Sequence, residues 1–168
     1  MLRKTLSPPA MLAAGLILGA ASRLLDIYTT NLGNIFSQLA VWILLGVLIS
    51  IYSDTKLKAA LNILPFCLGM LVTYYAAAFL TRGVYSPVFI TGWTVFALCS
   101  PIFAYFTWMA KEPGLFPKII GAGIVAASVL SSLVLFDGFR VYDAAITILL
   151  VYFLFIKDIK RPAERNKA

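Results

Sequence analysis

The sequence has no histidine, only two cysteines, and only seven acidic residues among its 168 positions. Histidine is the side chain that most often acts as general acid or base at neutral pH and as a metal ligand. Two isolated thiols cannot complete a tetrahedral zinc shell, so Cys67 and Cys99 are interpreted as buried free thiols. No carboxylate lies in the middle of a long apolar run, where proton-coupled pumps place one. We therefore expect no metal site, no cofactor and no catalytic residue.

Charge is scarce while apolar residues are abundant. Charged residues make up 12% of the chain and hydrophobic residues 61%, with a mean hydropathy of +0.93. A soluble domain carries about 25% charged and roughly 45–50% apolar residues. A chain this small could not hide so much apolar surface from water, so a lipid bilayer is the expected surrounding. The net charge of +7 lies in short loops and a tail; we assign it to topology and lipid headgroups, and we expect no nucleic-acid partner.

Six apolar runs approach the length of about 20 residues that crosses a bilayer as a helix. Charged or turn-forming residues separate the runs, and no linker or second domain is evident. The predicted fold is therefore an all-α bundle of six transmembrane helices in a single domain, followed by a basic tail at 157–168. The predicted spans are about 8–24, 35–52, 59–80, 88–108, 118–136 and 141–156.

Lysine and arginine alternate between the two sides of this arrangement. With the N-terminus inside, eleven of these residues lie in cytoplasmic segments and only Arg23, Arg82 and Arg140 lie outside. This bias predicts that both termini are cytoplasmic, in a multi-pass protein of a bacterial cytoplasmic membrane. An alternative for the first run is a cleaved secretory signal, because a basic start precedes a short apolar stretch and the small residues of 19–22.

The three external arginines suggest a binding site. Arginine offers a planar fork of donors that matches carboxylate or phosphate, and each external arginine has a tyrosine nearby. One interpretation is an outward-facing site for a small anionic or zwitterionic molecule; the other is an ordinary belt of interfacial residues and ion pairs. If a binding site is present, the segment 26–34 could cover it as a lid. The alternative is that this segment is a turn in which Asn34 is the N-cap of the second helix. The candidate ligand-binding residues are Arg23, Asp26, Tyr28, Arg82, Tyr85, Arg140 and Asp143.

Small residues recur at helical spacing on the first run. Such spacing allows two helix backbones to approach closely, either within the bundle or against a partner membrane protein. The candidate partner-packing residues are Ala10, Ala14, Gly15 and Gly19. An aspartate pair at the outer face, Asp137 and Asp143, gives a weaker hypothesis of a membrane enzyme.

Two resemblances add to this interpretation. The segments 34–42, 49–53 and 135–140, with Gly69-Met70 and Tyr74-Tyr75, resemble a family of uncharacterised small membrane proteins of Gram-positive bacteria. The architecture is similar to the substrate-binding S-components of energy-coupling-factor vitamin transporters, whose first helix docks a coupling subunit through an Ala-x-x-x-Ala motif. Ala10 and Ala14 match that spacing. The resemblance implies a substrate site near the outer face.

We therefore expect an integral membrane protein that binds or transports a small molecule. A non-catalytic accessory or immunity-type subunit acting through helix contacts is the main alternative, and a membrane enzyme is the third.

Overall fold

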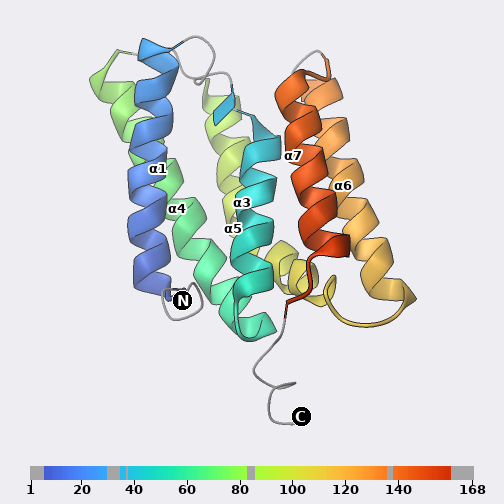
Figure 1. Cartoon of the computed structure of the whole chain (residues 1–168). Helices are drawn as coiled ribbons and strands as arrows, with labels where there is room; N and C mark the ends of the chain where they lie inside the picture. The colour runs from blue at the N-terminus through green and yellow to red at the C-terminus, as the bar shows by residue number, and fades with distance from the viewer. Residues whose placement is uncertain (1–5, 30–34, 37, 83–85, 136–137, 160–168) are drawn as a thin grey trace.

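The structure, a computed structural model, describes residues 6–29, 35–36, 38–82, 86–135 and 138–159. These residues form helices and connecting segments and contain no strand, which confirms the all-α class (Figure 1). The elements are α1 (Pro8–Tyr28), α3 (Leu39–Tyr52), α4 (Lys56–Leu80), α5 (Pro87–Met109), α6 (Leu115–Leu135), α7 (Val141–Val151) and the π-helical turn η2 (Tyr152–Ile156).

Four helices, α1, α4, α5 and α6, are long and apolar enough to cross a membrane. The other two apolar helices are shorter, Leu39–Tyr52 and Val141–Ile156. Successive helices run in opposite directions, so that α1 begins and η2 ends at the same end of the bundle (Figure 1). A membrane protein follows from these helices; six crossings and the orientation of the ends stay predictions.

The first helix is longer than expected. It continues to Tyr28, four residues beyond the predicted end at 24, because Arg23 and Asp26 form an ion pair one turn apart and Thr29 bonds to the Leu25 carbonyl. Residues 26–28 are therefore helical and do not form a lid or turn. Asn34 lies outside the described residues, and the residue at the N-cap of α3 is Gln38.

The central element is α3, which has no exposed residue along its whole length. On one side Val47 and Ile51 pack with Ile146 and Leu150 of α7. On the other side Trp42 and Ile49 join a second core cluster built with α4 and α5. A helix that is apolar all round belongs in a protein core or in a membrane, and α3 packs against α4, α5, α6 and α7.

Close approach of α1 and α4 depends on glycine. A Cβ atom added to Gly15 would lie 2.2 Å from the Phe66 carbonyl oxygen, and one added to Gly19 would lie 2.2 Å from that of Met70. The hydroxyl of Thr73 donates to the Leu16 carbonyl across this contact, at 2.8 Å. The small-residue face of α1 is thus covered by α4 of the same chain, and Ala10 and Ala14 are half-buried beside it.

Two prolines lie in helix interiors, Pro65 in α4 and Pro101 in α5. Proline has no N–H, so the carbonyl four residues earlier loses its helical partner. For Pro101 that carbonyl belongs to Ala97, and the buried Ser100 hydroxyl donates to it at 2.7 Å. The helix therefore continues past Pro101 with this carbonyl satisfied.

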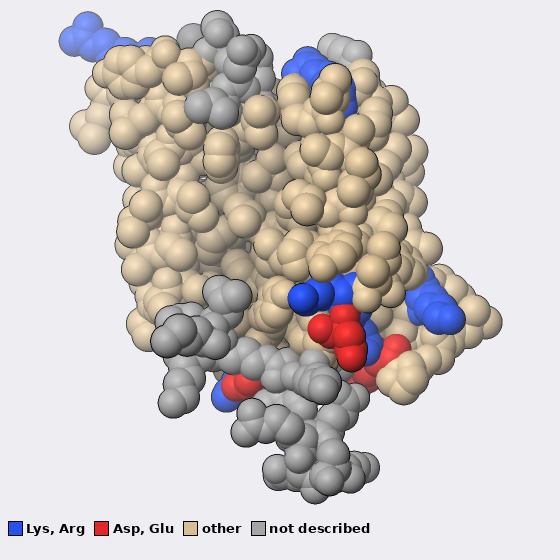
Figure 2. All heavy atoms as spheres, viewed as in Figure 1, with Lys and Arg blue, Asp and Glu red and all other residues tan. Residues whose placement is uncertain are grey.

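The two ends of the bundle differ in charge. We call the end that holds Lys56, Lys58, Lys111, Lys118 and Lys157 the lysine end, and the end that holds Arg23, Arg82 and Arg140 the arginine end. On the face shown in Figure 2, a broad band without charged side chains separates them. Such a band is the surface that a bilayer covers.

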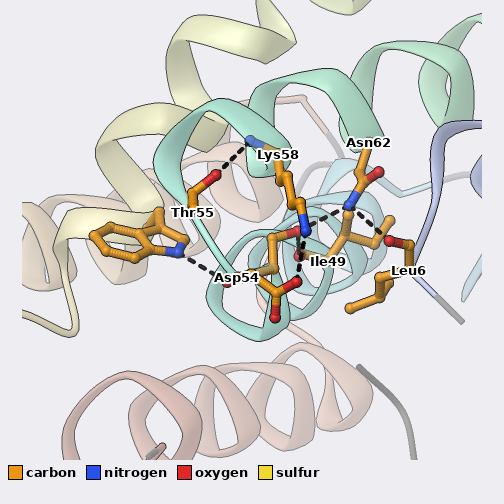
Figure 3. A network of polar contacts seen from close by, with 8 residues as sticks. Leu6, Ile49, Asp54, Thr55, Lys58 and Asn62 are labelled. Carbon is orange, nitrogen blue, oxygen red and sulfur yellow. Dashed lines mark hydrogen bonds and ion pairs between the residues drawn. The ribbon is translucent and has the colours of Figure 1, made fainter. Parts of the chain in front are cut away.

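Polar groups at the lysine end bond to one another and join α3, α4 and α5. The Asn62 amide, 2% exposed, donates to the Ser53 hydroxyl and to the Leu6 carbonyl (Figure 3). The Trp108 indole donates to the Ser53 carbonyl at 2.9 Å. Lys56 pairs with Glu112 at 3.1 Å and lies over the Trp108 ring. These contacts fix the turn between α3 and α4, and we interpret them as structural.

Candidate functional site

At the arginine end, the first turn of α7 holds a buried carboxylate. Asp143 is 1% exposed, and one of its oxygens accepts the backbone N–H of Arg140 at 2.9 Å. An acidic residue at this third helical position satisfies a free N–H group and meets the positive end of the helix dipole. The other oxygen accepts the Ser132 hydroxyl of α6, also at 2.9 Å. Two neutral donors thus hold a carboxylate that is shielded from water.

Gln38 approaches the same helix turn from the N-cap of α3. Its side chain is 1% exposed, and its Nε2 donates to the Tyr142 hydroxyl at 3.0 Å. The guanidinium of Arg140 donates to the same hydroxyl and lies 5.8 Å from the ring centre. The Oε1 atom of Gln38 is buried and has no hydrogen-bond partner within the described part of the chain. Buried polar atoms nearly always have a partner, so this amide oxygen is an available acceptor.

Serines of α6 line this region. Ser128 and Ser132 are each 1% exposed, and Ser131 is 8% exposed. The Ser131 hydroxyl donates to the Ser128 carbonyl within the helix, whereas that of Ser132 reaches Asp143. Gln38, Ser132 and Asp143 thus form a buried polar group at the meeting point of three helices, and exposed Arg140 lies at its edge. We call it the Gln38 cluster, consisting of Gln38, Ser132, Arg140, Tyr142 and Asp143.

A separate pair lies at the end of α1. Arg23 and Asp26 form an ion pair along one face of the helix, with side chains 14% and 33% exposed. Tyr74 of α4 interacts with both charged groups. The Nε of Arg23 is buried and lacks a partner among the residues described. This pair neutralises itself locally.

The seven predicted ligand-binding residues therefore do not form one group. Arg23 and Asp26 pair on α1, and Arg140 and Asp143 belong to the Gln38 cluster. Arg82 is exposed at the end of α4, with a φ of 51°, and Tyr28 is 79% exposed. At the arginine end, α4 and α7 lie on opposite sides of the bundle (Figure 1). Tyr85 lies outside the described residues.

Three members of this region were not among the predicted site residues: Gln38, Ser132 and Tyr142. The chain has a single glutamine, and its position at the border of an apolar run was the one available signal. Serine is frequent in membrane helices, so Ser132 carried no signal by itself. Asp137, the predicted companion of Asp143, lies outside the described residues. The described residues contain no cluster of three metal-ligating side chains.

Comparison with known proteins gives one family. A family model, described as a family of unknown function (DUF6518), matches residues 3–167. No curated protein and no solved structure matches the chain. The match agrees with the resemblance to an uncharacterised family and adds no activity to it.

Proposed function

The chain belongs to this family of unknown function, and from the geometry of its arginine end we propose that it is a membrane protein that binds or transports a small zwitterionic or anionic molecule. The binding site we propose is the Gln38 cluster. The proposal includes six membrane crossings with the lysine end in the cytoplasm, which places the cluster on the external side. The resemblance to S-components is an analogy from the sequence, and no solved structure matches the chain.

The unpartnered amide oxygen of Gln38 is the observation that carries the proposal. Leaving a buried acceptor without a donor costs about 1–3 kcal/mol. A ligand that brings an N–H or O–H group to Oε1 would remove this penalty, which supports a ligand with such a donor. Asp143 is buried with two neutral donors, and a ligand donor that carries positive charge would stabilise this carboxylate further.

Arg140 supplies the opposite charge. Its guanidinium has five N–H donors, and its planar fork matches a carboxylate or phosphate. Tyr142 lies between it and Gln38, since its hydroxyl bonds to both side chains. A ligand with an ammonium group near Gln38 and Asp143 and an acidic group near Arg140 would therefore meet complementary groups at both of its ends.

A thermal-shift screen tests the proposal. The purified protein in detergent is heated with amino acids, betaines, hydroxy acids and nucleotides at matched ionic strength. A specific ligand raises the apparent melting temperature by mass action. We expect at least one zwitterion or anion to do so, and the absence of any shift across these compounds would contradict the proposal.

Variants then locate the site. Gln38→Met keeps the size of the side chain and removes the amide, so it should abolish the shift; Arg140→Ala should weaken it. Arg82→Ala is the matched control, because this arginine is exposed at the same end of the bundle and outside the cluster. If Arg82→Ala abolishes binding while Gln38→Met preserves it, the site lies elsewhere at the arginine end.

A further inference from the structure

A groove of about 340 Å³ lies among α3, α4, α5 and α6, deep between the two ends of the bundle. Small-molecule sites have volumes of roughly 300–1,000 Å³, so the groove is large enough to hold a ligand. On α5 its lining extends from Trp93 to Thr107, roughly 21 Å of helix at 1.5 Å per residue. It contains no member of the Gln38 cluster and is independent of the site proposed above.

The lining of the groove is apolar and carries no charged side chain. The hydroxyl groups of its two serines are already bonded within their own helices. Ser50 donates to the Gly46 carbonyl and Ser100 to that of Ala97, each at 2.7 Å. Because these serines are already hydrogen-bonded, the groove favours an occupant that needs no hydrogen bond, which is hydrocarbon.

The groove opens sideways between α5 and α6. Phe103 and Phe106 of its lining are 51% and 43% exposed. On the opposite wall Gly123 is exposed, and a Cβ atom added there would meet nothing within 4 Å. This opening faces the apolar perimeter of the bundle, so the bilayer is the source of whatever enters.

We propose that the groove binds one acyl chain of an anionic phospholipid from the leaflet at the lysine end. Charge complementarity selects the headgroup. Described lysines gather at the lysine end, and exposed Lys118 of α6 lies there about 3 Å along the helix axis from Ile120, a lining residue, on another face of the helix. A lysine at that level extends its ammonium group to the headgroup region while its stem lies along apolar surface, and anionic headgroups attract it.

Quenching of tryptophan fluorescence by brominated acyl chains tests the occupant. Trp42 lines the groove but is only 9% exposed, so a chain in the bilayer reaches it by entering the groove. In a Trp93→Phe, Trp108→Phe background Trp42 is the one remaining tryptophan. We expect brominated phosphatidylglycerol in nanodiscs to quench its emission. Emission that brominated lipid leaves unchanged would overturn the proposal.

Two glycines provide a matched pair of variants. Gly123→Leu fills the groove without a backbone clash, and Gly92→Leu adds the same side chain to an open site on α5 that does not line it. We expect Gly123→Leu to lose most of the quenching and Gly92→Leu to retain it. Equal quenching in the two variants would overturn the proposal.

Native mass spectrometry of the chain with all its tryptophans gives a second measurement. Wild type and Gly92→Leu should retain a bound phosphatidylglycerol that Gly123→Leu loses. Lys118→Gln should lose the preference for phosphatidylglycerol over phosphatidylcholine. If wild type shows no such preference, the anionic headgroup is wrong; if Gly123→Leu retains the bound lipid, the groove is not the site.

Discussion

The hydroxyl of Ser132 on α6 donates to the carboxylate of Asp143 on α7 at 2.9 Å, and each side chain is 1% exposed. This bond joins two consecutive helices just below the segment that connects them. It also supplies one of the two donors that keep a buried carboxylate satisfied. The position of Asp143 in the Gln38 cluster therefore depends on a serine that has no charge and no unusual sequence context.

Ser132→Ala should destabilise the protein by about 1–3 kcal/mol, because it leaves one oxygen of the buried carboxylate without its donor. Denaturant unfolding followed by circular dichroism in detergent measures the change. Ser131→Ala is the matched control, since that hydroxyl bonds within α6. A Ser131 variant as unstable as the Ser132 variant would contradict this account.

Gly15→Ala should separate α1 from α4. The added Cβ atom would overlap the Phe66 carbonyl oxygen, and overpacking of this kind costs typically about 1–3 kcal/mol. Thermal unfolding in detergent should show a lower midpoint. Gly92→Ala, at an open helical position, should leave the midpoint unchanged or raise it, because alanine favours helix over glycine. Equal losses in both variants would mean that the α1–α4 contact is not this close.

Asn62→Leu should lower the free energy of unfolding by about 1–3 kcal/mol, because the buried Ser53 oxygen and the half-buried Leu6 carbonyl both lose a donor. Lys58→Ala removes a neighbouring ion pair with Asp54 that is well exposed, so its effect should stay below about 1 kcal/mol. Chemical denaturation of the two variants compares them, and a larger loss in the Lys58 variant would refute the structural role of Asn62.

Cysteine labelling should reveal opposite sides of the membrane at the two ends. In a Cys67→Ala, Cys99→Ala background, a membrane-impermeant maleimide should label the Val141→Cys variant on intact cells. It should label the Lys58→Cys variant only after permeabilisation. Val141 is 90% exposed and Lys58 is also exposed, so access within the protein does not limit either reaction. Labelling of both variants on intact cells would rule out the proposed topology.

Hydropathy predicted the helices well, because a run of apolar residues has one stable conformation in lipid. The end of α1 was missed, since Arg23 and Asp26 suggest a loop in the sequence yet form an i, i+3 pair on a helix. The spacing of Gly15 and Gly19 predicted a close approach but not its partner. The structure identifies this partner as α4, whose Phe66 and Met70 carbonyl oxygens lie against the two glycines.

The candidate site was harder to predict. In the sequence, the pattern of an arginine with a tyrosine nearby occurs at three helix ends. Only the fold shows which of these residues lie together. Gln38 and Tyr142 are separated by 104 residues, and no local signal connects them. The availability of the Gln38 oxygen is a property of its three-dimensional surroundings and cannot be inferred from its neighbours in the chain.

The shortness of α3 has a consequence for how the protein fits its bilayer. Its 14 residues give about 21 Å of helix, whereas the hydrocarbon core is about 30 Å thick. A lipid-facing helix this short would force the bilayer to thin. Because no residue of α3 is exposed, the four longer helices α1, α4, α5 and α6 set the hydrophobic thickness. The central helix ends short of them, and its polar N-cap, Gln38, is thereby recessed below the level of the headgroups.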